Sequence, residues 1–206
     1  MHSTTALASD VATKTATKHH SVWKTSIRFT IVTAILLGLA YPLAVTGVAS
    51  LIFPHKAAGS LILKDGQIIG SELLAQSFTS DKYFHPRPSA AGNGYDATAS
   101  GGSNLAQSNK TLVDRIQGSI DKLAKENPGK PVPIDLVTTS GSGLDPDITP
   151  DAAIFQAPRV AKARNLTEDR ILQLIAQNTT SRQLGLLGEP RVNVLDLNLA
   201  LDNLTK

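Results

Sequence analysis

The feature that most constrains this chain is a run of 25 residues without a charge, from Phe29 to Phe53. A helix of that length spans about 37 Å, which exceeds the roughly 30 Å of hydrocarbon in a bilayer. A cleaved signal peptide also combines a basic start with an apolar run, but its apolar core is only about 7–15 residues long. We therefore expect an uncleaved transmembrane helix at residues 29–53, followed by one soluble domain at residues 54–206.

The excess positive charge of the chain lies before this run. The net charge is +3, and residues 1–28 hold four basic residues against one acidic residue, whereas the rest of the chain is balanced. Basic residues that flank a membrane helix favour the cytoplasmic side. Residues 1–28 are therefore predicted to be a basic cytoplasmic tail, and the soluble domain is predicted to lie outside the cell (inner) membrane. The four basic residues are Lys14, Lys18, Lys24 and Arg28, and only Lys56 and Lys64 follow the run closely.

The same balance of charge argues against a nucleic-acid partner, because such binding depends on basic residues that neutralise phosphates. Within the apolar run, Pro42 removes a backbone donor, so a kink is expected near Tyr41. Small residues lie at Gly38, Ala40, Ala44 and Gly47. They either let a second membrane helix approach closely or are ordinary residues of a lone anchor, and the sequence leaves both interpretations open.

The soluble domain is predicted to mix short strands with helices. Residues 60–63 and 67–69 flank a Gly-containing turn and predict a hairpin. Residues 83–104 are rich in Pro, Gly, Asn and Ser, and so long a loop is usually functional or ordered by a partner. A strand is expected at 133–137, a strand followed by a helix at 191–204, and helices at the Leu112–Leu123 periodicity (capped by Ser108 or Asn109), after Thr149 and after Thr167. The fold class is one N-terminal transmembrane helix followed by a small α/β (α+β) extracytoplasmic domain.

A search for catalytic or metal-binding chemistry finds no convincing site. There is no cysteine, no HExxH motif and no Walker A sequence. Ser140 and Ser142 lie among glycines without a G-x-S-x-G motif, which favours a flexible loop. Residues Asp145, Asp147 and Asp151 have the spacing of calcium ligands, but Pro150 and Gln156 occupy the positions that need Gly and a bidentate Glu. Asp151 is better explained as a residue of a helix first turn.

Five motifs follow one another along the chain: Tyr83-Phe84-x-x-Arg87-Pro88-Ser89, Gly102-Ser103-Asn104-Leu105, Ser140-Gly141-Ser142-Gly143-Leu144-Asp145-Pro146, Gln156-x-x-Arg159-Val160-Ala161-x-Ala163-Arg164 and Val192-Asn193-Val194-Leu195-x-Leu197-Asn198-Leu199-Ala200-Leu201-Asp202. In this order they resemble the C subunit of the bacterial Kdp potassium-transporting ATPase. The resemblance covers the chain from the membrane helix to the C-terminus, and the five motifs together are highly specific. Two positions depart from the family pattern: Ala106-Gln107 replaces a frequent Gly-Pro, and Asp147 replaces a frequent His.

The resemblance implies a non-catalytic accessory subunit of a high-affinity potassium uptake complex. Its partners would be a channel-like potassium-conducting subunit and a P-type subunit that hydrolyses ATP, which this chain would assemble and stabilise in the bilayer. A family proposal gives the subunit a role in raising ATP affinity, as a catalytic chaperone. On this sequence the nucleotide contacts would be Gln156 and Arg159, so ATP is expected only through the complex, and no metal or other cofactor is expected.

The predicted topology opposes that nucleotide role, because ATP is on the cytoplasmic side. The simpler interpretation is that Arg159, Lys162 and Arg164 form the solvated face of a helix. A different class of function also fits the residues, namely a free-standing, membrane-tethered extracytoplasmic binding protein.

Overall fold

The computed structural model describes residues 22–204, so most of the predicted basic tail lies outside the described residues. The chain divides into two compact units, with the boundary between Ala57 and Ala58. In the first unit, α1 (Val22–Ile35), a π-helical turn η1 (Leu36–Ala40) and α2 (Tyr41–Ile52) follow one another as a continuous helix, and the short α3 (Pro54–Ala57) follows. Among residues 22–204, this is the one helix long and apolar enough to cross a membrane.

The helix begins at Val22, before the predicted apolar run, because a helix can continue past the point where the hydrocarbon ends. Near Tyr41, where a kink is expected, the helix has its π-helical turn: the Tyr41 N–H donates to the Leu36 carbonyl, five residues back. This widened turn directly precedes Pro42, whose missing N–H cannot continue the regular α-helical pattern. None of the side chains of residues 22–52 is buried within the chain, which suits a helix surrounded by lipid.

The second unit begins with the predicted hairpin. Strands β1 (Leu61–Lys64) and β2 (Gln67–Ser71) pair antiparallel, with a bulge between Ile62 and Leu63. Asp65 and Gly66 both have positive φ angles, 53° and 78°. Two such residues make the tight turn whose twist matches that of the flanking strands.

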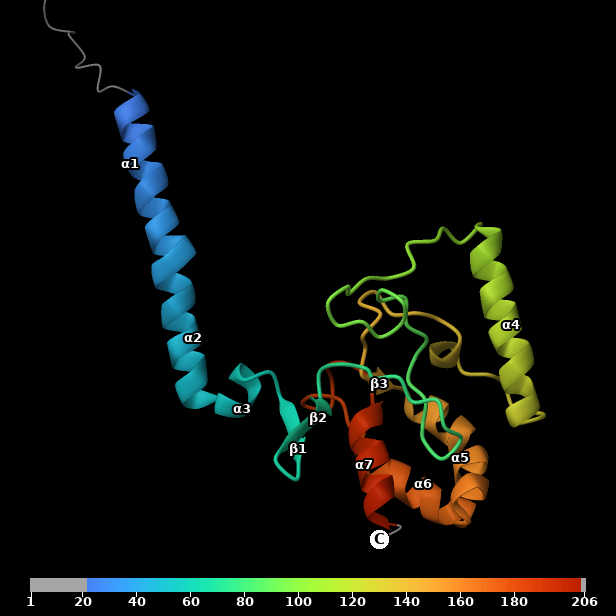
Figure 1. The fold of residues 1–206 in the computed structure, drawn as a ribbon. Coiled ribbons are helices and arrows are strands. Elements are labelled where there is room, and N and C mark those ends of the chain that lie inside the picture. Colours follow the sequence, from blue (N-terminus) through green and yellow to red (C-terminus); the bar gives the residue numbers. More distant parts are fainter. Residues whose placement is uncertain (1–21, 205–206) are drawn as a thin grey trace, which may run out of the picture. The chain divides into compact units, whose positions relative to one another are not determined.

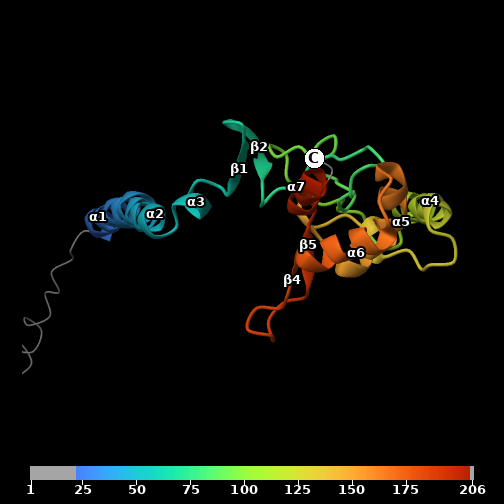
Figure 2. The ribbon, with the colours of Figure 1, turned by 90° about the horizontal axis from the view of Figure 1, so that it is seen from below.

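The second sheet is small and antiparallel, in the order β3 (Asp147–Ile148), β5 (Arg191–Asn193) and β4 (Thr179–Thr180). Helices α5 (Pro150–Arg164), α6 (Glu168–Gln177) and α7 (Val194–Leu204) pack around the core, as Figures 1 and 2 show. The largest fully buried core side chains include Phe84, Ile171, Ile175, Leu197 and Leu201. The predicted mixture of short strands and helices is confirmed.

The predicted helix starts are also confirmed, and each has a side-chain cap. Asn109 precedes α4 (Lys110–Glu126), Thr149 precedes α5 and Thr167 precedes α6. In each case the side-chain oxygen of the capping residue accepts a backbone N–H of the first turn, which otherwise has no partner in the helix. The predicted strand followed by a helix at 191–204 is present as β5 and α7.

The strand expected at residues 133–137 is wrong. Ile134–Leu136 form a 3₁₀ turn, η2, in which the Leu136 N–H donates to the Pro133 carbonyl at 3.1 Å. Pro131 and Pro133 have no N–H to give to a neighbouring strand, so the alternating apolar pattern is not sufficient for a ladder. The buried carboxylate of Asp135 accepts the Thr149 N–H at 2.7 Å, which ties this turn to the start of α5.

Candidate functional site

Gln156 lies in the middle of α5 and is buried. Its amide pairs with both backbone groups of one residue in a distant loop: Oε1 accepts the His85 N–H at 2.8 Å, and Nε2 donates to the His85 carbonyl at 3.1 Å. The same Nε2 donates to the Ala152 carbonyl at 3.2 Å. Such a two-way pairing has the pattern of a strand ladder, with a side-chain amide in place of a neighbouring strand.

The side-chain amide of Asn198, in α7, pairs in the same way with both backbone groups of Phe84, the residue before His85. Its Oδ1 accepts the Phe84 N–H at 2.8 Å, and its Nδ2 donates to the Phe84 carbonyl at 3.0 Å. Asn198 is buried, as is the Phe84 ring. Two amides from two helices therefore satisfy four consecutive backbone groups that the core would otherwise leave without partners.

Two arginines of α5 extend this arrangement toward the N-terminal side of the loop. Arg159 donates through Nη1 to the carbonyls of Asp81 at 2.8 Å and Tyr83 at 3.0 Å. Arg164 donates through Nε to the Lys82 carbonyl at 2.8 Å, and its guanidinium lies 4.8 Å from the centre of the Tyr83 ring. All five carbonyls of residues 81–85 thus accept side-chain donors. We call Gln156, Arg159, Arg164 and Asn198 the main-chain clamp.

Acidic residues hold the two arginines in place. Glu126, at the end of α4, lies 3.2 Å from Arg159 Nε, and Asp202 of α7 lies 2.7 Å from Arg164 Nη2. The Tyr83 hydroxyl also donates a hydrogen bond to Asp202 Oδ2 at 3.1 Å. The clamp and its acidic partners therefore connect α4, α5 and α7 to one loop, and the charge-assisted hydrogen bond from Arg164 to Asp202 is stronger than a neutral one.

The expectation of a solvated helix face is wrong for two of its three residues. The side chains of Arg159 and Arg164 are only 11% and 8% exposed, whereas Lys162 is exposed. The reason is that this side of α5 faces the turn and loop at residues 81–85, whose carbonyls need donors away from water. A guanidinium can donate hydrogen bonds to several carbonyls at once. The exposed ammonium of Lys162 does not do so within the described residues.

The two residues of the family nucleotide proposal do come together, since Arg159 Nη2 donates to Gln156 Oε1 at 2.7 Å. Both polar atoms of the Gln156 amide are already hydrogen-bonded within the chain. Burial, and then the nearby Arg159 charge, lower the pKa of His85, the residue they hold. The uncharged form of the His85 ring is favoured beside the fixed positive charge of the Arg159 guanidinium.

Sequence reasoning missed Asn198 and Asp202 as members of this site. A signal was present: in the pattern Leu197-Asn198-Leu199-Ala200-Leu201-Asp202, two polar residues four positions apart interrupt a helix of apolar residues. Residues at that spacing lie on the same side of a helix. A buried Asn within an apolar helix needs hydrogen-bond partners, which indicates a specific contact.

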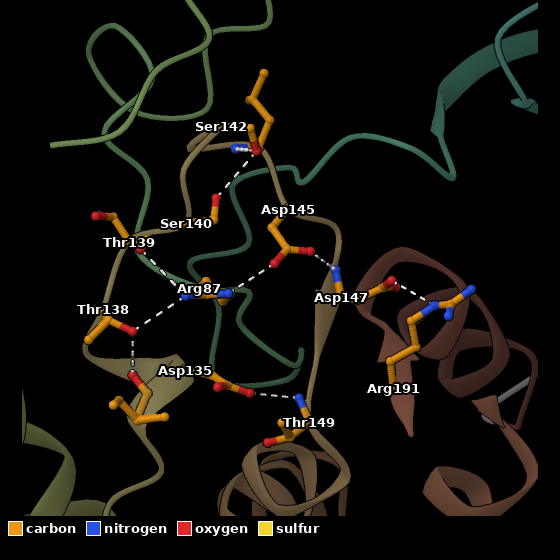
Figure 3. A network of polar contacts seen from close by, with 12 residues as sticks. Arg87, Asp135, Thr138, Thr139, Ser140, Ser142, Asp145, Asp147, Thr149 and Arg191 are labelled. Carbon is orange, nitrogen blue, oxygen red and sulfur yellow. Dashed lines mark hydrogen bonds and ion pairs between the residues drawn. The ribbon is translucent and has the colours of Figure 1, made fainter. Parts of the chain in front are cut away.

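Figure 3 shows a second polar network, in which Arg87 of the long loop contacts residues 138–145. Arg87 Nη1 lies 3.0 Å from Asp145 Oδ2, and Arg87 Nη2 donates to Thr138 Oγ1 and the Thr139 carbonyl, each at 3.4 Å. The Ser89 hydroxyl donates to the Gly143 carbonyl at 2.6 Å. The loop at 83–104 and the turn around Ser140 and Ser142 are therefore held against each other by specific bonds, and the Ser142 carbonyl accepts one more from the Ser100 hydroxyl at 3.0 Å. The hydroxyls of Ser140 and Ser142 lie 3.3 Å apart within the turn itself.

Gly143 makes that close contact possible. Its φ is +67°, and a Cβ there would lie 2.6 Å from the Gly101 carbonyl oxygen and 2.7 Å from the Ala91 nitrogen. Both the backbone conformation and the lack of space require glycine. The Gly101 N–H donates to the Ser142 carbonyl at 2.8 Å, so the two loops also share a backbone bond.

The aspartates with calcium-like spacing have other partners. Asp145 pairs with Arg87, Asp147 Oδ2 lies 2.9 Å from Arg191 Nε, and Asp151 lies in the first turn of α5 as expected. Burial raises the pKa of Asp147, and the Arg191 charge opposes this effect. Within residues 22–204, no group of three or more His, Cys, Asp or Glu residues is placed to hold a metal ion.

Comparison with known proteins gives the same family over nearly the whole chain. A family model described as KdpC, K+-transporting ATPase, c chain, matches residues 23–203. The chain is 57% identical to the potassium-transporting ATPase KdpC subunit of Acidobacterium capsulatum, over 88% of this chain and 97% of that protein. It is 59% identical to the KdpC subunit of Bradyrhizobium diazoefficiens, over 81% and 89% of the two chains. With its membrane-type helix and its ordered, motif-bearing loops, the chain therefore belongs to the KdpC family, the c chain of K+-transporting ATPases.

Proposed function

We propose that this chain is a non-catalytic accessory subunit that assembles and stabilises an ATP-driven potassium uptake complex in the cell (inner) membrane. Its partners are a channel-like potassium-conducting subunit and an ATP-hydrolysing P-type subunit. Family membership and the names of the relatives support this assignment. The observation that carries the non-catalytic part is the clamp: Gln156 and Arg159 are used to bind the chain's own loop.

The basic residues before the helix support an N-terminus in the cytoplasm and a domain outside. In that orientation the domain does not meet ATP, so any effect on ATP affinity travels through contacts with the other subunits. The helix is a contact element as well as an anchor. Gly38 and Gly47 support this role, because among the described residues nothing beyond the helix itself packs against either glycine, and small residues let a second helix approach closely.

The proposal is tested by purifying the full-length chain in mild detergent from cells that express the whole transport operon. We expect stable co-elution with the P-type and channel-like subunits, and loss of the intact complex when the chain is absent. A chain that elutes alone while the other subunits remain assembled would overturn the proposal. That result would favour the free-standing, membrane-tethered binding protein.

A further inference from the structure

The connection between β4 and β5, residues 181–190, carries three leucines at its tip. The side chains of Leu184, Leu186 and Leu187 are 91%, 81% and 59% exposed. Figure 2 shows this connection projecting beyond the helices of the domain. Single exposed leucines are common on protein surfaces, but several together on one projection mark an interaction site. We call these three residues the leucine tip.

The leucine tip is a defined structure. The Gln183 N–H donates to the Leu187 carbonyl at 2.8 Å, and the Leu187 N–H donates to the Gln183 carbonyl at 2.9 Å. Leu184 and Gly185 both have positive φ, 53° and 74°, as in the tightest hairpin turns. At the base, Arg182 pairs with Glu189, and β5 continues into the core through Val192.

The residue at the most exposed point of this turn is unusual. Asn, Asp or Gly normally occupies a left-handed position, because a larger side chain is unfavourable there. Leu184 combines that backbone conformation with an exposed apolar side chain. Backbone strain of this kind concentrates at binding sites. Within the described residues nothing covers Leu184, and a contact with another molecule would offset both costs.

The charges around the leucine tip indicate which kind of molecule this is. Residues 179–193 contain three charged side chains, and all three are paired: Arg182 with Glu189, and Arg191 with Asp147. Attachment to an anionic lipid surface normally uses unpaired Lys or Arg beside the apolar group. A neutral apolar projection fits an apolar socket in a protein.

We infer that the leucine tip inserts into an apolar socket on the extramembrane surface of another subunit of the transport complex. This inference rests on the proposed function, because only an assembled complex supplies such a subunit. The partner surface is expected to be an uncharged pocket with a polar rim. Leu184 fills its centre, and the Arg182–Glu189 pair lies at its edge.

The first test compares two matched variants of the full-length chain, each expressed with the other subunits. The triple variant Leu184→Ser, Leu186→Ser, Leu187→Ser removes the leucine tip. The control Leu63→Ser, Ile68→Ser changes two apolar residues of the other hairpin, both 62% exposed. We expect at least tenfold less of the triple variant to stay with the complex, while the control stays bound like the wild type. Equal retention of both variants would overturn the inference.

The failure of the inference and the failure of the proposed function give different results. If the wild-type chain itself does not co-purify, the proposed function fails. If the wild type and the triple variant co-purify equally, the proposed function stands and only the inference about the leucine tip is wrong. A lower thermal midpoint of the triple variant than of the control would show that its loss of binding comes from misfolding, and the second test then decides.

The second test leaves folding intact and identifies the neighbour directly. A photoreactive benzoylphenylalanine in place of Leu184 is activated by light in native membranes. We expect a crosslink to another subunit of the complex. A crosslink to lipid, a crosslink to a second copy of this chain, or no crosslink at all would each contradict the inference. The same probe at Ile68 is the control, and it should not give the same product.

Discussion

At the scale of single residues, the clamp shows that one pair of side chains fits two different ligands, a phosphate group or main-chain groups. A Gln and an Arg three positions apart on a helix suit phosphate recognition. Here they bind main-chain groups, because the loop at 81–85 passes along the same side of α5. Gln156 and Asn198 each replace a missing strand, so each should be sensitive to the loss of its amide.

Gln156→Met keeps the size of the side chain and removes both hydrogen-bonding atoms. It leaves the His85 N–H and carbonyl without partners, and each buried unpaired group costs about 1–3 kcal/mol. We expect the free energy of unfolding of the purified chain to fall by about 2–4 kcal/mol. The exposed Lys162→Met on the same helix should change it by less than about 0.5 kcal/mol. Chemical unfolding followed by fluorescence or circular dichroism measures the difference.

The same pair of variants addresses the nucleotide role. Any complex that assembles with Gln156→Met should keep the wild-type KM for ATP, because the Gln156 amide is buried and both of its polar atoms are bonded within the chain. A raised KM for ATP with an unchanged unfolding midpoint would instead indicate direct contact with the nucleotide.

Asp196 gives a prediction about pH. Burial, followed by the charges of Glu72 and Asp147, raises the pKa of Asp196. Asp196 lies in the first turn of α7, where the helix dipole favours a carboxylate, so these effects outweigh the dipole. A folded-state pKa above the unfolded value of about 3.9 means that ionisation lowers stability as pH rises through the folded-state pKa.

Asp196→Asn should therefore be more stable than the wild type at pH 7. Its advantage should shrink as pH falls and vanish below about pH 3.9, where the aspartate is protonated in both states. Thermal midpoints measured from pH 3 to pH 8 test this. An advantage that is the same at every pH would mean that packing, and not ionisation, separates the two proteins.

At the scale of elements, the connections are as specific as the helices. The turn at 140–143 and the loop at 83–104 meet through Gly143, where even a methyl group would collide with backbone atoms. These loops have few regular backbone ladders, so close packing and single hydrogen bonds fix their shape.

Gly143→Ala should lower the free energy of unfolding by about 2–4 kcal/mol, from a left-handed conformation and a clash together. Gly141→Ala is the matched control two residues away. It has no strained φ, and no atom lies within 4 Å of its Cβ position. Scanning calorimetry should give a much lower midpoint for Gly143→Ala only. Equal midpoints would show that the two loops separate easily.

At the scale of the whole molecule, a membrane helix and a folded domain are joined in one chain whose orientation is open to direct test. The chain has no native cysteine, so an introduced one is the only thiol. Gln156 is buried and unsuitable for labelling, whereas Ser142 is exposed.

Ser142→Cys should react with a membrane-impermeant thiol reagent in intact spheroplasts, because the basic residues before the helix favour a cytoplasmic N-terminus. Ser21→Cys in the basic tail is the reciprocal control and should react only after lysis. The opposite pattern would place the domain in the cytoplasm and bring ATP within its reach.

The sequence alone determined the elements whose causes are local. The membrane helix follows from uninterrupted apolar residues, the hairpin from Asp65-Gly66, and the helix starts from Asn109, Thr149 and Thr167, all within a few positions of their effects. Only the tertiary structure decided what Gln156 and Asn198 do, since their partners lie 71 and 114 residues away. It also turned the expected strand at 133–137 into η2, because a strand needs a neighbour and this proline-containing segment has none within the described domain. Local preference sets the form of a segment, but burial decides which polar group each side chain must satisfy, and burial is a property of the whole fold.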